Sequence, residues 1–335
     1  MAEKHIFIGL GGSGVNTASL IKYKVYERTQ GTEMKSRIEV MNSTYRFLFV
    51  DTDSRDVSNA NDKYRNLYES GKVDFINKEA ELLNLGDTNP YTSYNEAKLC
   101  PDLKINRRII EACPSMVSES MDNRDLSFGA GALRLKSRIA FGRKESQFID
   151  KLRTCINELN QDEIDSEKNV IHYWVISSCN GGTGSGIVQD VLYLVNMTHR
   201  TLIDKGNPKV GLVLYMPRIF MNLNADNEKY PRNAYAVFKE LEAFQKWAKE
   251  SAKNTLYHRM SMVDDFTLFD EKMSYRPFEF CIPIDFHTER NSNMGSIEKM
   301  YSNTAELLFY IHSGKGAGGF KSFLDNYEDG EVSVE

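Results

Sequence analysis

Two glycine-rich runs carry the residue types that bind phosphate groups. Gly-Leu-Gly-Gly-Ser-Gly at residues 9–14 and Gly-Gly-Thr-Gly-Ser-Gly at residues 181–186 each follow a short apolar segment. Glycine lets a backbone N–H approach an anion without an intervening Cβ, and a helix N-terminus adds partial positive charge. One such run is also found in dinucleotide-binding oxidoreductases and, in part, in tight turns. Two runs in equivalent positions favour a shared polyphosphate site.

The two runs form one site if parallel strands bring them to the same edge of a sheet. We expect a Cβ at Gly182 or Gly184 to stand where phosphate oxygens approach, and the Thr183 and Ser185 hydroxyls to act as further donors. The alternative is a glycine-rich helix cap without a ligand. A Walker-type NTPase is disfavoured, because the sequence at residues 314–316, Gly-Lys-Gly, has neither the preceding strand nor the following Ser or Thr.

Two carboxylates follow another apolar segment. Asp51 and Asp53 flank Thr52 directly after residues 46–50. A triphosphate needs a divalent cation to offset charge that N–H donors cannot neutralise, and Mg²⁺ prefers oxygen ligands. The pair therefore predicts Mg²⁺ binding, directly or through water. The alternative is a pair of solvated or helix-capping carboxylates, and for Asp53 we give it equal weight.

The apolar pattern predicts the elements that position these residues. We expect strands at residues 5–10, 46–50, 170–176, 210–216, 265–269 and 278–284, and helices at 15–27, 133–159, 187–203, 232–252 and 296–312. Strands that alternate with helices indicate a Rossmann-like α/β fold, a parallel sheet with helices on both faces.

Composition excludes several classes of protein. The chain has 335 residues, 41% of them apolar, and a formal charge of -5, which suits a globular protein of one or two domains. We find no basic patch with interleaved aromatics, so we expect no nucleic-acid partner. The five cysteines are scattered and include no C-x-x-C pair, which favours a cytoplasmic location and argues against structural zinc. No apolar run approaches the roughly 18 residues of a membrane span.

These motifs, in this order, resemble the tubulin/FtsZ superfamily, in particular a divergent bacterial tubulin-like protein. The second glycine run matches the superfamily's signature loop G-G-T-G-[ST]-G, and residues 9–14 and 47–53 resemble its first two nucleotide loops. Residues 129–132, Gly-Ala-Gly-Ala, fall where the family senses the terminal phosphate, and Pro217 falls in its sugar-proximal loop. The helix from Arg232 resembles the central helix, whose start contacts guanine in that family.

The resemblance implies GTP or GDP, with Mg²⁺, as the bound ligand. The residues that would bind the nucleotide are Gly11, Gly12, Ser13, Asp51, Thr52, Asp53, Gly129, Ala130, Gly131, Gly181, Gly182, Thr183, Gly184, Ser185, Gly186, Pro217, Tyr230 and Asn233. Asn233 would offer a donor and an acceptor to the guanine edge, with simple N-capping as the alternative, and Tyr230 or Tyr235 would stack on the base. For Gly129 and Gly131 the alternative is a flexible turn.

The resemblance also implies an organisation into parts. We expect a nucleotide-binding domain at residues 1–230 with a polar surface insertion at about 54–124, a central helix at 231–254, a reduced C-terminal domain at 255–324 and a mobile acidic tail at 325–335.

The downstream sequence departs from the polymerising members of the superfamily. Their Asn-x-Asp-x-x-Asp-like loop is absent from residues 253–269, where only Asp264 and Asp265 are acidic, so the catalytic residue is unknown and these two are candidates. We predict a slow GTPase that self-associates into filaments. The alternatives are a nucleotide-bound scaffold without turnover and an NAD-dependent oxidoreductase, in which Asp51 would hold a ribose.

Overall fold

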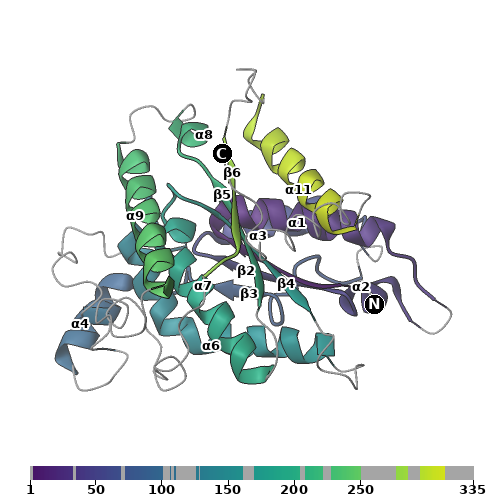
Figure 1. Cartoon of the computed structure of the whole chain (residues 1–335), viewed down its shortest axis with the longest axis horizontal. Coiled ribbons are helices and arrows are strands. Elements are labelled where there is room, and N and C mark those ends of the chain that lie inside the picture. The colour runs from purple at the N-terminus through teal and green to yellow at the C-terminus, as the bar shows by residue number, and fades with distance from the viewer. Residues whose placement is uncertain are drawn as a thin grey trace.

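A parallel six-stranded sheet forms the centre of the computed structural model (Figure 1). The structure describes residues 3–32, 35–68, 72–100, 106, 109–110, 126–127, 129–160, 170–203, 208–221, 228–249, 277–285 and 295–313. The strands are β1 (Lys4–Leu10), β2 (Tyr45–Asp51), β3 (Leu82–Asn84), β4 (Ile171–Ser178), β5 (Lys209–Tyr215) and β6 (Phe280–Ile284). Their order in the sheet is β3–β2–β1–β4–β5–β6, and every neighbouring pair is parallel. The predicted α/β class is confirmed.

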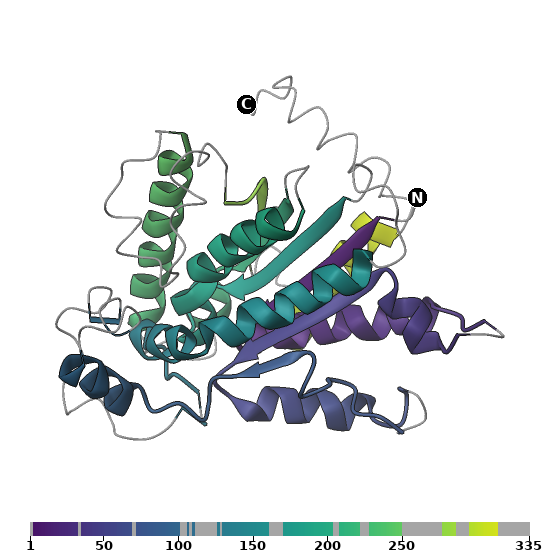
Figure 2. The same ribbon diagram turned by 90° about the horizontal axis from the view of Figure 1, so that it is seen from below.

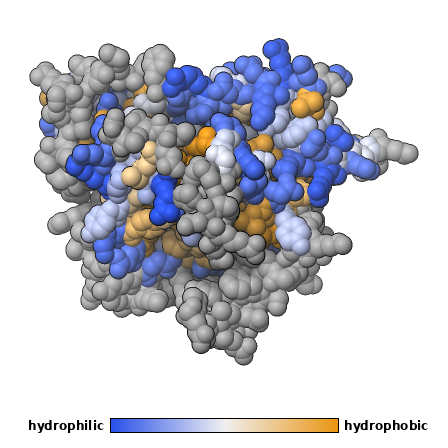
Figure 3. Space-filling view, turned by 90° about the horizontal axis from the view of Figure 1, so that it is seen from above, coloured by the Kyte–Doolittle hydropathy of each residue, from blue (hydrophilic) through white to orange (hydrophobic). Residues whose placement is uncertain are grey.

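Helices cover both faces of this sheet (Figures 1 and 2). They are α1 (Gly11–Arg28), α2 (Arg37–Asn42), α3 (Ser54–Tyr64), α4 (Pro90–Leu99), α6 (Arg134–Asn160), α7 (Thr183–Leu202), α8 (Arg218–Met221), α9 (Lys229–Lys249) and α11 (Ile297–Ser313). None of the helices in the described ranges is long and apolar enough to cross a membrane. On the side seen in Figure 3, hydrophilic residues make up most of the described surface and apolar ones gather near its centre.

The strands supply a separate hydrophobic core to each helical layer. Every residue of β1 is buried, and successive side chains alternate between the faces. Ile6 and Ile8 pack with α6, α7 and α9, whereas Phe7 packs with α1, α3 and α11. Burial on both faces explains why the sequence shows continuous apolar runs at the strands rather than alternation.

The glycine runs form the first turns of helices rather than loops before them. α1 begins at Gly11 and α7 begins at Thr183, ahead of the starts predicted at residues 15 and 187. Glycine has a low intrinsic helix propensity, so the periodic pattern starts only after it. The backbone N–H groups of both runs therefore lie at helix N-termini.

Two elements of the predicted C-terminal domain at residues 255–324 belong to the same sheet and helical layers as the nucleotide-binding domain. β6 pairs with β5 from Phe280 to Ile284, and α11 packs against α1. Consequently α9, the predicted central helix, lies between two neighbouring strands of the sheet, β5 and β6, in the order of the chain. β3 lies within the predicted surface insertion yet pairs with β2, and its three residues are too few for a pattern to reveal.

Other expectations fall outside the described residues. They are the strand at 265–269, the candidates Asp264 and Asp265, and the acidic tail at 325–335. The division into domains stays a prediction.

Candidate functional site

A cavity of about 370 Å³ lies where the carboxyl ends of β1, β2 and β4 meet. In open parallel sheets, ligands bind at this edge. The predicted site residues that line it are Gly11, Gly12, Ser13, Asp51, Thr52, Asp53, Gly129, Gly181, Gly182, Thr183, Gly184 and Tyr230. The residues that line it and were not predicted are Asn16, Asp56, Ser178, Asn180, Phe220 and Tyr301. The structure thus brings most of the predicted residues to one place.

Six predicted residues lie outside the cavity lining, namely Ala130, Gly131, Ser185, Gly186, Pro217 and Asn233. Ala130 is buried against Gly182, and Gly186 packs closely on Arg134 of α6. Pro217 starts α8, because its carbonyl oxygen accepts the N–H of Phe220 at 3.0 Å.

The N-termini of α1 and α7 meet at the cavity. Neither N-cap residue, Leu10 or Gly182, makes a side-chain capping hydrogen bond among the described residues. The first turns approach closely, since a Cβ on Gly11, whose φ is +66°, would stand 3.1 Å from the Gly184 nitrogen. Uncapped N–H groups and two helix dipoles converge here, and this arrangement attracts an anion.

The hydroxyl groups of the second glycine run have partners inside the protein. Ser185 donates to the carbonyl oxygen of Gly181, and Thr183 Oγ1 lies 2.6 Å from Thr52 Oγ1. A hydroxyl has a single hydrogen to donate. The expectation that both hydroxyls face a phosphate is therefore wrong for Ser185. The backbone N–H groups remain as the donors of this run, apart from that of Gly181, which donates to Ser178 Oγ at 3.3 Å.

A buried carboxylate stands beside these N-termini. Asp51 is 3% exposed, its Oδ1 accepts the N–H groups of Thr52 and Asp53 at 2.7 and 3.2 Å, and its Oδ2 has no hydrogen-bond partner in the described part of the chain. Burial, and then the nearby Asp56 carboxylate, raises the pKa of Asp51 to about 7. Burial also raises the pKa of Asp56, which accepts a hydrogen bond from Asn16 at 3.2 Å.

These two carboxylates fit a divalent cation. Their negative charges repel each other in a cavity that otherwise presents N–H groups, and a cation bound between them and a phosphate would compensate both. Asp53, which the sequence paired with Asp51, caps α3 through the N–H of Arg55 at 2.9 Å and pairs with the Arg55 guanidinium. The hydrogen bonds of Arg55 hold the pKa of Asp53 below its usual value. Asp56, in the first turn of α3, is the better partner for Asp51.

Aromatic side chains line the cavity from three helices. Phe220 of α8 and Tyr230 of α9 have ring centroids 6.3 Å apart, and both lie on the β5 side. Tyr301 of α11 donates to Ser13 Oγ at 3.2 Å and packs edge-on against Tyr215. Tyr235, the other stacking candidate, is 67% exposed and does not line the cavity. No local sequence signal points to Phe220 or Tyr301, because distant elements carry them.

Comparisons with known proteins identify the family. A family model described as tubulin like matches residues 6–332. The chain belongs to the tubulin-like family. The resemblance seen in the sequence is thereby confirmed.

Solved structures of three other proteins match the chain at low sequence identity. CetZ from Methanosaeta thermophila strain DSM 6194 is 12% identical with a TM-score of 0.45, and the match covers 93% of this chain and 55% of that one. CetZ2 from Haloferax volcanii, solved as a GTPγS-bound protofilament, is 11% identical with a TM-score of 0.45, covering 95% of this chain and 62% of that one. A GTPγS-form protofilament of TubZ from Bacillus thuringiensis serovar israelensis is 14% identical with a TM-score of 0.41, covering 92% and 56%. The chain thus spans less than two thirds of their lengths. No curated protein matches its sequence.

Glycine at position 184 is predicted to contribute to the stability of the fold, and not only to ligand approach as the sequence suggested. A Cβ on Gly184 would stand 2.8 Å from the Leu10 carbonyl oxygen and closer still to Ser177 Oγ, whereas a Cβ on Gly181 would meet only Ser178 Oγ, at 3.0 Å. We expect Gly184→Ala to lower the free energy of unfolding by about 1–3 kcal/mol through overpacking. Gly181→Ala is the matched control and should unfold close to the wild type in urea. Equal stability of the two variants would contradict the packing described.

Proposed function

We propose that this tubulin-like protein binds a guanine nucleotide, GTP or GDP, together with Mg²⁺, in the cavity between α1 and α7. The observation that carries the proposal is the pair of uncapped helix N-termini beside the carboxylates of Asp51 and Asp56. Phosphate groups would accept the N–H groups, and a divalent cation would bridge them to the carboxylates. A simple anion alone would leave both carboxylates uncompensated.

The strand order supports one orientation of the nucleotide. Asp51 and Asp56 follow β2, the two N-termini follow β1 and β4, and Phe220 follows β5. Phosphates would lie over β1 and β4 with the cation toward β2, and the sugar and base would extend toward Phe220 and Tyr230, whose rings suit stacking. We propose guanine because the family resemblance implies it. An NAD-dependent oxidoreductase is less well supported, since its single pyrophosphate site has no use for a second glycine-rich N-terminus.

We further propose that turnover is slow in an isolated chain. The carboxylates of the described cavity lining are Asp51, Asp53 and Asp56. Asp53 is paired with Arg55, and we assign Asp51 and Asp56 to the cation, which leaves none of the three for activating water. A neighbouring copy would supply the missing group, with Asp264 or Asp265 as candidates. We also propose that the chain assembles into filaments and that it is located in the cytoplasm. The four cysteines in the described part of the chain are free thiols, which is consistent with a reducing compartment.

Binding is tested by titrating the purified protein with a fluorescent GTP analogue, with and without Mg²⁺. GTP should displace the analogue, whereas ATP and NAD should need at least about tenfold higher concentrations. Asp56→Asn should weaken GTP binding in the presence of Mg²⁺ because a cation ligand is lost. Without Mg²⁺ it should leave binding equal or tighter, because a charge that repels phosphate is removed.

The control for this change is Asp62→Asn, an exposed position near the other end of α3. It should bind as the wild type does under both conditions. Equal displacement by GTP, ATP and NAD would contradict guanine specificity, and identical behaviour of the two variants would contradict the cation site.

Turnover is tested by measuring phosphate release across a wide dilution series. If a neighbouring copy completes the site, the rate per molecule should rise with protein concentration, and Asp265→Ala should abolish the rise while leaving GTP affinity intact. A rate near background at every concentration would instead favour the nucleotide-bound scaffold. Brisk turnover that does not depend on concentration would show that a catalytic group lies within one chain.

A further inference from the structure

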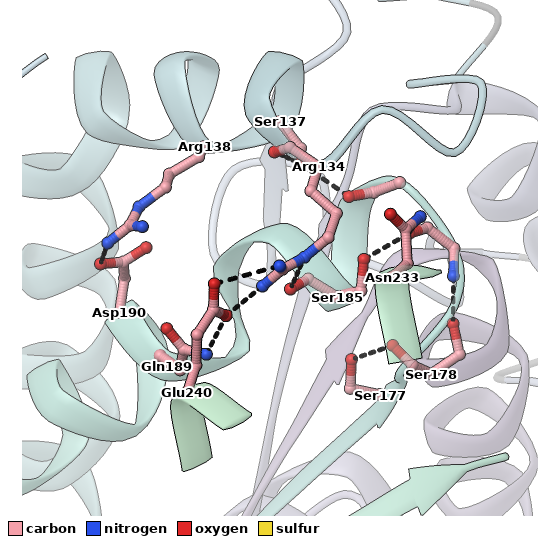
Figure 4. Close-up of polar contacts among 12 residues, drawn as sticks. Arg134, Ser137, Arg138, Ser177, Ser178, Ser185, Gln189, Asp190, Asn233 and Glu240 are labelled. Atoms are coloured by element: carbon pink, nitrogen blue, oxygen red, sulfur yellow. Dashed lines mark hydrogen bonds and ion pairs between the residues drawn. The ribbon is translucent and has the colours of Figure 1, made fainter. Parts of the chain in front are cut away.

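The carbonyl oxygens of the second glycine run are held by side chains of α6 and α9 (Figure 4). Asn233 Nδ2 donates to the carbonyl oxygens of Asn180 and Gly181, at 2.9 and 3.3 Å. Ser137 Oγ lies 2.7 Å from the carbonyl oxygen of Gly182 and 2.8 Å from that of Arg134, and shares its single hydrogen between them. The C=O and the following N–H of a trans peptide point in opposite directions. The bonds to Gly181 and Gly182 therefore turn the N–H groups of Gly182 and Thr183 away from α6 and α9. The N–H of Gly181, which follows the Asn180 carbonyl, donates to Ser178 Oγ at 3.3 Å.

The same Asn233 nitrogen also holds the segment at residues 129–132. It donates to the carbonyl oxygen of Ala132 at 2.9 Å. Ala132 has a φ of 56°, and Gly129 and Gly131 also have positive φ values. A left-handed alanine costs about 1–2 kcal/mol and persists only where surrounding contacts hold it. Asn233 thus links two segments that are far apart in sequence, one of which reaches the cavity through Gly129.

Helix α9 is anchored firmly enough for Asn233 to fix these segments. Glu240, two turns along α9, accepts from the Arg134 guanidinium of α6 and from Gln189 of α7, as Figure 4 shows. Arg134 Nε also donates to the Ser185 carbonyl oxygen at 3.0 Å. Three helices therefore hold the run through one polar network.

The contacts of Asn233 conflict with a direct contact to guanine through its nitrogen. Its amide nitrogen has two hydrogens, which already serve three carbonyl oxygens. Donation to a base would break at least one of these bonds. Asn233 is also absent from the cavity lining.

We infer that Asn233 is a positioning residue, which holds the backbone of the second glycine run so that its N–H groups face the phosphates of the nucleotide. The inference rests on the proposed function. It assigns Asn233 to phosphate affinity rather than to base choice, and it makes α9 part of the phosphate site without a direct contact.

The test is Asn233→Asp, which keeps the shape but sets a carboxylate against three carbonyl oxygens. The affinity for GTP should fall by at least about tenfold, and the ratio of GTP to ATP affinity should stay within about twofold of the wild type. Ser137→Ala, a smaller change that removes one donor to the same run, should weaken GTP binding by about threefold with the same ratio. Arg232→Ala, the exposed neighbour of Asn233 paired with Glu228, is the matched control and should bind GTP as the wild type does.

The outcomes separate the inference from the proposed function. A wild-type protein that does not bind GTP would overturn the function itself. If the wild type binds GTP, a loss of discrimination between GTP and ATP in Asn233→Asp would overturn the inference in favour of base contact. Unchanged GTP affinity in a folded Asn233→Asp protein would reduce Asn233 to a structural role. If Asn233→Asp does not fold, unchanged affinity in Ser137→Ala would count against the inference in its place.

Discussion

The close approach of two helix N-termini is the constraint on which the rest of the site depends. A Cβ at Gly11 would stand only 3.1 Å from the first turn of α7, at a φ of +66° that side chains rarely adopt, and one at Gly184 would collide with the end of β1. Glycine at both positions lets α1 and α7 start side by side at the carboxyl edge of the sheet. Residues of both first turns line one cavity, and the N-cap residues supply no side-chain hydrogen bond to the N–H groups there. A single glycine-rich turn would provide only one of these two helix N-termini.

The remaining parts of the site either balance the positive charge of the two helix N-termini or hold their backbone in place. Asp51 and Asp56 bring negative charge from the β2 side, which makes the cavity suited to an anion and a cation together. Asn233 of α9 and Ser137 of α6 donate hydrogen bonds to the carbonyl oxygens of the second run. Tyr301 brings α11 to the first run through Ser13. Elements that are far apart in the sequence, from α1 to α11, therefore meet at the cavity.

The sequence predicted the fold well because the strands are buried on both faces and appear as apolar runs. It also predicted that the two glycine runs lie at the same edge of the sheet, because each run follows a strand and the strands are parallel. It could not show that α1 and α7 begin within these runs. Glycine has a low helix propensity, so a first helical turn that depends on tertiary packing leaves no signal in the sequence. β3 escaped notice because three residues carry no periodicity.

The prediction of the site was incomplete for different reasons at different residues. Asp56 is brought back to Asp51 by the first turn of α3, and a helical projection from the cap at Asp53 would have found it. Phe220 and Tyr301 belong to helices whose placement depends on tertiary packing, so no local pattern reveals them. For Asn233 the family resemblance supplied a direct role in base contact, whereas its three bonds to backbone carbonyl oxygens indicate an indirect one.

The nucleotide that the purified protein carries is the most direct measure of what this cavity binds. Denaturing the protein and separating the released small molecules by chromatography would identify it. We expect GTP or GDP in nearly equimolar amount with the chain. Release of a nicotinamide dinucleotide, or of an adenine nucleotide in its place, would contradict the proposal.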